Sequence, residues 1–151
     1  MKKIIFVCHG NICRSPMAEF VFKNMVEKAG LSDSFKICSA ATSTEEIGNP
    51  VHHGTRKKLA QFGISTDGKR AIQFTKNDYD KYDLIIVMDQ ANLRNLGYII
   101  GSDTKGKVCK LLDFCDGGDI ADPWWTGDFD KTYDDVERGC KALLSYLTER
   151  E

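Results

Sequence analysis

The sequence predicts an α/β fold, a three-layer α/β/α sandwich around a mostly parallel sheet. Short apolar, β-branched segments alternate with longer segments whose apolar residues recur at helical spacing. This alternation runs from one end of the 151 residues to the other, and no linker, repeat or low-complexity segment interrupts it. We therefore expect a single domain over residues 1–151.

Four segments have the length and the apolar character of buried strands. They cover residues 3–7, 35–40, 83–88 and 108–112. Because parallel strands need crossover connections, the helical segments between them fit a parallel sheet. Ligands of such sheets bind beyond the carboxyl ends of the strands, so the loop after the first strand is a candidate site.

The helical spacing predicts helices over residues 15–29, 51–62, 90–97 and 132–148. Pro16 suits the first turn of the first helix, since the N–H that it lacks would have no partner there. Asp89 is a candidate N-cap of the third helix. Gly30, Gly63 and Gly97 are expected to end the first three helices, because glycine readily takes the left-handed conformation that follows a helix.

Composition and charge exclude several classes of protein. The formal net charge of −1 gives no reason to expect nucleic-acid or membrane binding. The apolar run after Met1 is too short for a signal peptide, and no stretch approaches the roughly 18 apolar residues of a membrane helix. We therefore expect a cytoplasmic location. The six cysteines are then expected to be reduced, and their spacing matches no zinc site, so we expect neither a metal nor a cofactor.

The most specific signal lies directly after the first strand, where residues 8–15 read Cys-His-Gly-Asn-Ile-Cys-Arg-Ser. A loop between a strand and a helix converges its backbone N–H groups on one point, and the helix adds its positive end. Cys8 at the bottom of such a cradle is expected as a thiolate nucleophile. Arg14 offers a bidentate fork to phosphoryl oxygens. This arrangement predicts a covalent phosphatase.

The residues between Cys8 and the helix suggest how the loop is held. Gly10 is expected in a conformation closed to residues with a β-carbon, and Asn11 tolerates a left-handed backbone and can tie the loop through its amide. Ser15 can donate its hydroxyl to Cys8, or cap the helix. His9 is expected at the rim, since adjacent side chains point apart in extended backbone.

A phosphatase also needs an acid, because an alkoxide or phenolate leaves poorly without a proton. Six aspartates lie in the last third of the chain: Asp113, Asp116, Asp119, Asp122, Asp128 and Asp130. Asp122 stands out because Pro123 and two tryptophans follow it, and apolar rings favour a protonated carboxyl. Trp124 and Trp125 are expected as walls for a flat ring, with core packing as the alternative for Trp125.

Residues 8–16 together with Asp122-Pro123 resemble the low-molecular-weight protein tyrosine phosphatases. The resemblance extends over nearly the whole chain, since residues 39–43, 47–50 and 88–93 also look like segments of the family in the family's order. It implies a four-stranded parallel sheet flanked by helices, with a phosphate-binding loop after the first strand. It also implies hydrolysis of protein phosphotyrosine through a phosphocysteine intermediate.

The resemblance further implies a role for each site residue. Cys8 accepts the phosphoryl group, Arg14 clamps it, and Asp122 acts first as acid and then as base. Ser39 supports the loop from below, together with Asn11 and Ser15. Cys13 can trap oxidised Cys8 as a reversible disulfide. The residues expected to contact substrate are His9, Gly10, Asn11, Ile12, Cys13, Ser15, Trp124 and Trp125.

The implied partner is a phosphotyrosine-containing protein, with the phosphatase itself a monomer or a weak dimer. Trp124 and Trp125 stand where the family commonly has two tyrosines. Glu45 stands where some members place an aromatic residue, which makes this side of the cleft more acidic. Where members can carry a histidine this chain has Lys69, so no role carries over, and none is evident for Cys115.

Three alternatives remain open at this point. Arginine phosphatases use the same loop but carry a small polar residue in place of the bulky Ile12. Arsenate reductases need extra cysteines near the acid, and Cys109 and Cys115 are spaced for such a relay. A phosphate-binding or redox-sensing module without turnover is the third, although such a module has no need of an acid such as Asp122.

Overall fold

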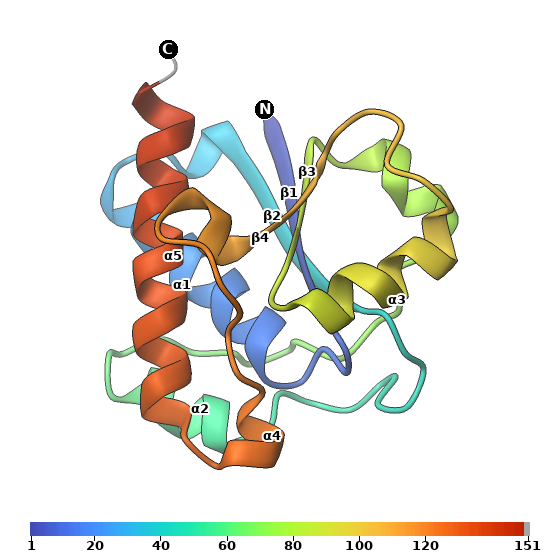
Figure 1. The fold of residues 1–151 in the computed structure, drawn as a ribbon. Helices are drawn as coiled ribbons and strands as arrows, with labels where there is room; N and C mark the ends of the chain where they lie inside the picture. Colours follow the sequence, from blue (N-terminus) through green and yellow to red (C-terminus); the bar gives the residue numbers. More distant parts are fainter. Residues whose placement is uncertain (150–151) are drawn as a thin grey trace.

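The four predicted strands form one sheet, in which every neighbouring pair is parallel. The computed structural model describes residues 1–149, and within them the strand order is β2-β1-β3-β4 (Figure 1). The strands are β1 (Lys2–Cys8), β2 (Phe35–Ala41), β3 (Leu84–Val87) and β4 (Val108–Lys110). The α/β architecture and the four-stranded parallel sheet are therefore confirmed.

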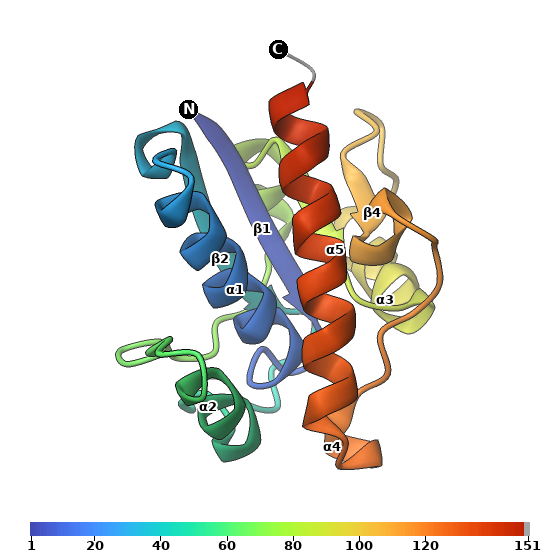
Figure 2. The same cartoon turned by 90° about the vertical axis from the view of Figure 1, so that its left-hand side faces the viewer.

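Helices cover both faces of this sheet. The α-helices are α1 (Arg14–Lys28), α2 (His53–Ala60), α3 (Gln90–Ile100), α4 (Pro123–Thr126) and α5 (Phe129–Glu149), and 3₁₀ turns lie at Ser32–Ser34, Lys76–Lys81 and Leu111–Phe114. α1 and α5 pack side by side on one face, and α3 lies on the other (Figures 1 and 2). None of these helices is long and apolar enough to cross a membrane.

The alternation of side chains along β1 builds the two cores. Ile4, Phe6 and Cys8 point into the core beneath α1 and α5, whereas Ile5 and Val7 point into the core beneath α3. All five are nearly or fully buried, because β1 is a central strand covered on both faces. Cys8 is therefore the last residue of a rigid strand, and its position is fixed by the packing of the residues before it.

The carboxyl ends of the strands meet at one edge of the sheet, and the loops that leave them form the site. At this edge the 8–15 loop lies next to the segment after β2 and the start of α3, and the chain returns to it at α4 (Figure 1). The segment before α4 is attached to the end of β3 by a backbone hydrogen bond, in which Ile120 N donates to Met88 O at 2.9 Å. Residues distant in sequence are thus brought around Cys8.

The third helix is longer than the sequence predicts, and Gly97 does not end it. α3 continues to Ile100, and Gly101 follows with a φ of 80°. The prediction of Gly97 as the end of the helix is wrong. Tyr98, Ile99 and Ile100 continue the helix, and Gly97 lies within it without a positive φ. Asp89 is confirmed as the N-cap, since its side chain accepts from Asn92 N.

Other boundaries differ by a few residues. α2 is shorter than the predicted helix over residues 51–62, because His52 caps its start by accepting from Gly54 N. β4 ends at Lys110, and the chain turns into a 3₁₀ segment where a longer strand was expected. α5 begins at Phe129, one turn before the predicted start. Asp122 starts the short helix α4, which the sequence analysis did not predict.

Two helical glycines provide a matched test of the packing. A β-carbon at Gly139 in α5 would come within 2.5 Å of Leu111 Cγ, whereas one at Gly97 in α3 would meet nothing within 4 Å. We expect Gly139→Ala to lower the free energy of unfolding by about 1–2 kcal/mol, because Leu111 is fully buried and cannot move aside freely. Equilibrium urea unfolding measures this loss.

Gly97→Ala is the control for that measurement. It should leave the free energy of unfolding unchanged or raise it by up to about 1 kcal/mol, since alanine favours the helix and the space is open. A Gly139→Ala variant as stable as the parent would contradict the close contact between α5 and Leu111.

Candidate active site

The 8–15 loop is shaped by one residue with a left-handed backbone. Asn11 has a φ of 59°, and among the non-glycine residues described it alone has a positive φ. Gly10 does not take such a conformation, and a β-carbon there would meet only ordinary contacts, the nearest being Glu46 Cγ at 3.5 Å. The expectation for Asn11 is confirmed, whereas the one for Gly10 is wrong.

The sulfur of Cys8 lies where N–H and O–H groups converge. The backbone N–H groups of Asn11 and Ser15 donate to Sγ at 3.3 and 3.4 Å, and the Ser15 hydroxyl lies 3.0 Å from it. Ser15 is the second residue of α1, so its N–H is one of those that a helix leaves free in its first turn. These groups stabilise negative charge on the sulfur.

A buried network under the loop holds it in this shape. The amide nitrogen of Asn11 donates to Ser15 Oγ at 2.8 Å and to Ser39 Oγ at 2.9 Å, and its oxygen accepts from Ile72 N. All the polar groups of this amide therefore have partners, although the side chain is almost fully buried. Ser15 serves Cys8 and the network and does not cap α1, whose N-cap residue makes no side-chain cap bond.

Behind Ser39 lies an ion pair that the sequence analysis missed. The Ser39 hydroxyl donates to Glu19 Oε1 at 2.5 Å, and Glu19 is 4.0 Å from the ammonium of Lys69. Lys69 also donates to Ser39 O at 2.9 Å. Burial lowers the pKa of Lys69, and the nearby Glu19 carboxylate opposes this change. Lys69 therefore belongs to the support of the loop.

Arg14 is buried and fixed by acceptors from two other segments. Its Nη1 donates to Asp89 Oδ2 at 2.6 Å and to Ile120 O at 2.9 Å, while Nη2 lies 3.4 Å from Asp122 Oδ2. Burial lowers the pKa of Arg14, but the charge of Cys8 and the bond to Asp89 more than offset it, so the pKa is raised overall. The guanidinium is a permanent cation next to the sulfur.

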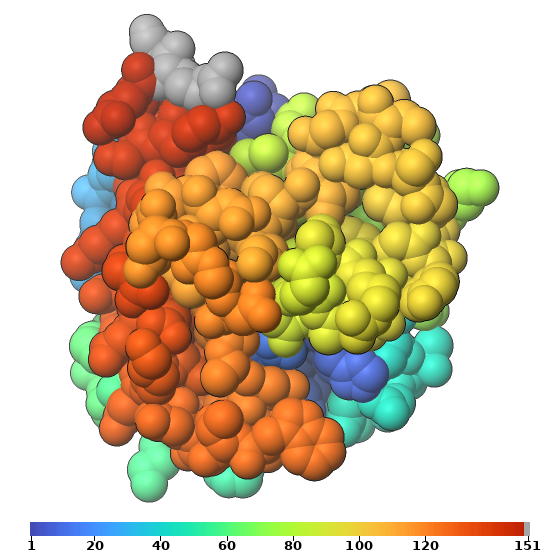
Figure 3. All heavy atoms as spheres, viewed as in Figure 1, coloured from blue at the N-terminus to red at the C-terminus, as the bar shows by residue number. Residues whose placement is uncertain are grey.

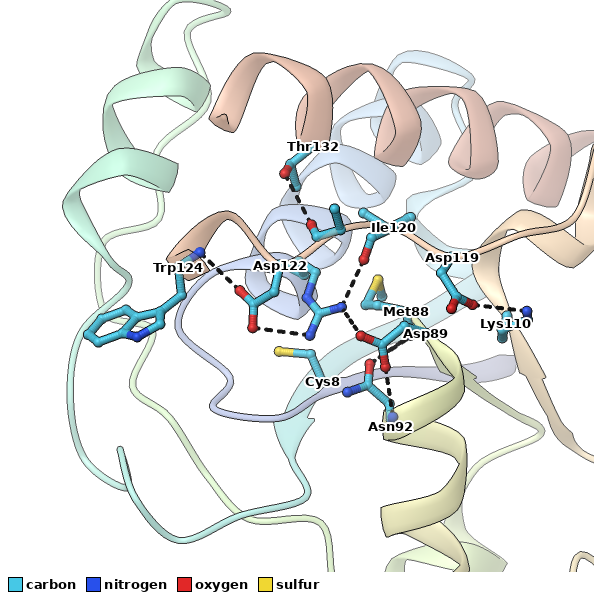
Figure 4. Close-up of polar contacts among 12 residues, drawn as sticks. Cys8, Met88, Asp89, Asn92, Lys110, Asp119, Ile120, Asp122, Trp124 and Thr132 are labelled. Carbon is cyan, nitrogen blue, oxygen red and sulfur yellow. Dashed lines mark hydrogen bonds and ion pairs between the residues drawn. The ribbon is translucent and has the colours of Figure 1, made fainter. Parts of the chain in front are cut away.

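Asp122 joins this cluster through both of its oxygens. One contacts Arg14, and the other accepts from Trp124 N at 3.0 Å as the N-cap of α4 (Figure 4). The expected setting against apolar rings is therefore only partly found, because both oxygens face N–H groups. Pro123 follows at the first position of the helix, where it fixes the backbone of the cap.

The other five candidate aspartates have partners elsewhere. Asp119 is paired with Lys110 at 3.0 Å and points away from Cys8 in Figure 4. Asp116 pairs with Arg138, and Asp130 pairs with Lys58. Asp113 and Asp128 accept from backbone N–H groups of Lys110 and Lys131. Among the contacts of residues 1–149, Asp122 is the one aspartate of these six whose side chain contacts Arg14.

These residues line a cleft of about 410 Å³. Its buried floor includes Cys8 and Arg14, and Ile12 and Cys13 are buried as well, whereas Trp124 and Trp125 are exposed at its edge. Figure 3 shows the face of the molecule where early residues, in blue, are visible between the segment around residue 125 and the segment after β2. Both indoles are exposed, so the alternative of core packing for Trp125 is wrong.

Comparisons with known proteins agree with this geometry. Residues 3–151 match the family described as low molecular weight phosphotyrosine protein phosphatase. The chain belongs to this family. It is 39% identical over 154 residues to the low molecular weight protein-tyrosine-phosphatase YfkJ of Bacillus subtilis, and the match covers 100% of this chain and 99% of the relative.

Solved structures of family members superpose closely on this phosphatase. The crystal structure of YfkJ gives a TM-score of 0.96 and covers 100% of this chain and 97% of that one. SP-PTP from Streptococcus pyogenes is 44% identical, with a TM-score of 0.88 and coverage of 97% and 93%. The Drosophila arginine phosphatase DARP is 28% identical, with a TM-score of 0.88 and coverage of 97% and 98%.

In this phosphatase an aromatic cluster supports Trp124, and the sequence analysis missed it. The His52 ring stacks on Phe129 at 5.4 Å and meets the edge of Trp124 at 5.7 Å, and His52 N donates to Ile12 O. Burial lowers the pKa of His52, as do the charges of His53 and Arg56. His52 and Trp124 are far apart in the sequence, so no sequence pattern indicates that their rings are in contact.

The six cysteines are all free. Cys13 is buried, and burial, followed by the charge of Cys8, raises its pKa to about 12. Cys140 is buried, Cys38 and Cys109 are half-buried, and Cys115 is exposed. Neither Cys109 nor Cys115 lines the cleft, so the structure does not bring the two together with Cys8.

Proposed function

We propose that this phosphatase hydrolyses phosphotyrosine in proteins through a phosphocysteine intermediate on Cys8. The observation that carries the proposal is the placement of Cys8, Arg14 and Asp122 in one cleft with an aromatic edge. A nucleophile, a fixed cation and a carboxyl group are the three parts that such a displacement needs.

In the first step, the Cys8 sulfur attacks phosphorus, and the bond from phosphorus to the tyrosine oxygen breaks. Backbone N–H groups of the 8–15 loop and Arg14 receive the charge on the phosphoryl oxygens. The contact of Arg14 with Asp122 is long, at 3.4 Å, so a phosphoryl oxygen can replace it. Asp122, protonated for this step, gives its proton to the departing phenolate.

In the second step, water attacks the phosphocysteine. Asp122, now a carboxylate, accepts a proton from the water, and the bond between sulfur and phosphorus breaks. The Ser15 hydroxyl and the two N–H groups on the sulfur stabilise the thiolate that leaves. Inorganic phosphate is then released from the loop.

The walls of the cleft favour a phenyl ring over a guanidinium group. Ile12 presents a bulky apolar side chain, and Trp124 is held edge-on by His52, so both offer surface to a flat ring. DARP is an arginine phosphatase with a similar fold, so the fold alone does not decide between phosphotyrosine and phosphoarginine. The side chains that line the cleft therefore carry the preference that we propose. Arsenate reduction is disfavoured, because Cys109 and Cys115 lie outside the cleft lining.

The partner that follows from this activity is a protein carrying phosphotyrosine. The six free thiols support a reducing compartment, and we propose the cytoplasm.

We expect Cys8→Ser to abolish turnover and to retain binding of phosphotyrosine peptides, because the loop and Arg14 remain. Rapid quenching of the parent during turnover, followed by mass spectrometry, should find the phosphoryl group on Cys8. The same parent should hydrolyse phosphotyrosine peptides faster than phosphoarginine or phosphoserine peptides. A phosphoryl group on another residue, or a preference for phosphoarginine, would contradict the proposal.

Asp122→Asn should slow the release of a poor leaving group, such as the phenolate of phosphotyrosine, by about 10²–10⁴-fold. An activated aryl phosphate should be affected much less in the phosphorylation step, because its leaving group departs without a proton. Since Asp122 also acts in the second step, pre-steady-state bursts of the phenol are the measurement.

Asp119→Asn is the matched control, because Asp119 faces Lys110 and not the sulfur. It should behave like the parent with both leaving groups. If Asp119→Asn shows the dependence on the leaving group and Asp122→Asn does not, the assignment of the acid is wrong.

Mild peroxide should inactivate the protein reversibly. Peroxide oxidises the Cys8 thiolate to a sulfenic acid, Cys13 attacks this sulfur, water leaves, and a disulfide forms that a thiol reductant reopens. Cys13 must lose its proton during the attack, since its pKa is about 12. After equal oxidation, Cys13→Ser should recover less activity under reductant than the parent, and equal recovery would show that Cys13 does not protect.

A further inference from the structure

The rim of the cleft opposite the tryptophans carries two glutamates in sequence. Glu45 and Glu46 come from the segment after β2, and both line the cleft. The Glu45 side chain is 68% exposed, and its carboxylate contacts Nε2 of His9, which also lines the cleft. A carboxylate anchored at the entrance and open to solvent is placed to meet groups that flank the reacting phosphate.

Glu46 is held in place as well. Its Oε2 accepts from the side-chain amide of Asn49 at 2.5 Å, and its aliphatic chain lies against Gly10 in the 8–15 loop. The two glutamates are therefore fixed by contacts with this loop and with their own segment. Their charges remain close to the mouth.

No lysine or arginine lies at the entrance among the described residues that line the cleft, and the one basic side chain paired with these glutamates is His9, which contacts Glu45. Within the lining of the cleft, taken over residues 1–149, Arg14 is the one lysine or arginine, and it is buried at the floor. Arg14 already faces the carboxylates of Asp89 and Asp122. A phosphopeptide thus passes an acidic rim before its phosphate reaches the cation.

We propose that Glu45 and Glu46 select phosphotyrosine that is flanked by lysine or arginine. This inference rests on the proposed phosphotyrosine hydrolysis and names the class of peptide that the same site takes. The carboxylates of the rim repel the phosphate, and acidic residues next to phosphotyrosine increase this repulsion. Lysine or arginine next to phosphotyrosine reduces it, because each basic side chain can pair with a carboxylate at the entrance.

The size of the effect is that of exposed charge pairs. Such a pair changes affinity by a few-fold at most, and salt screens it over about 10 Å at 0.1 M ionic strength. With two carboxylates at the rim, we expect kcat/KM to be about 3-fold higher for lysine neighbours than for glutamine neighbours. Between lysine and glutamate neighbours the ratio should reach about 10-fold.

The experiment compares three phosphotyrosine peptides of one length, with lysine, glutamine or glutamate on both sides of the phosphotyrosine. Their kcat/KM values are measured in the parent at low and at high salt. The ratio of the lysine to the glutamate peptide should fall toward 1 as salt rises. Each ratio compares two peptides in the same protein at the same salt concentration. A change in the chemical step that affects both peptides equally therefore leaves the ratio unchanged.

The same ratio is then measured in the double variant Glu45→Gln with Glu46→Gln, where it should fall to about 1–2. Glu27→Gln is the matched control. It makes the same change of charge on the exposed part of α1, about 20 Å along the helix from Arg14, and should keep both the parent's ratio and its basal activity.

Three outcomes overturn the inference. A parent that hydrolyses all three peptides at similar rates, or prefers the glutamate peptide, refutes the selection and leaves phosphotyrosine hydrolysis standing. A lysine preference that survives in the double variant shows that other groups carry it. A parent that turns over a small aryl phosphate but none of the peptides contradicts the proposed function itself, and the selection falls with it.

Discussion

The site depends on one ion pair, between the buried Arg14 and the partly buried Asp89. Asp89 uses one oxygen to cap α3 and the other to hold the guanidinium, so a helix start and the anion clamp share a single carboxylate. Burying such charges is costly unless each is paired and hydrogen-bonded, and here Ile120 O completes the set. Removing one partner of a fully buried pair costs about 3–5 kcal/mol, because the other charge remains without compensation. The cost here is smaller, since the Asp89 side chain is 20% exposed.

The same pair suits the proposed binding of a phosphate group without reorganisation of the cleft. Nη1 of Arg14 is fully engaged by the scaffold, which fixes the plane of the guanidinium before any ligand arrives. The network from Asn11 through Ser39 to Glu19 fixes the 8–15 loop from the opposite side. Donors that already point to the place where charge develops need no rearrangement during the reaction. Since Arg14 and the 8–15 loop are held in place, we expect differences between peptide substrates to arise from the exposed side chains at the rim.

The sequence was sufficient to predict the parts of the site that are local. Cys8, Asn11 and Arg14 lie in one short loop after an apolar strand, so spacing and backbone chemistry were enough to predict that they lie together. Asp122 was found because proline and aromatic residues mark it. Asp89, Glu19, Lys69 and His52 could not be found in this way, since each acts through a partner that only the fold brings near. The error at Gly97 has a different origin, because a helix continues through a glycine when the residues after it keep the helical conformation, as Tyr98, Ile99 and Ile100 do.

During synthesis the N-terminus emerges first, and the chain order of the site then matters. The loop and strand that carry Cys8 are complete early, whereas Ile120 and Asp122, which contact Arg14, lie 106 and 108 residues further along. A nascent chain that ends before them has the proposed nucleophile but lacks the proposed acid and one of the acceptors that hold Arg14. If Cys8, Arg14 and Asp122 act as proposed, the site is complete only when the last third of the chain has folded against the first.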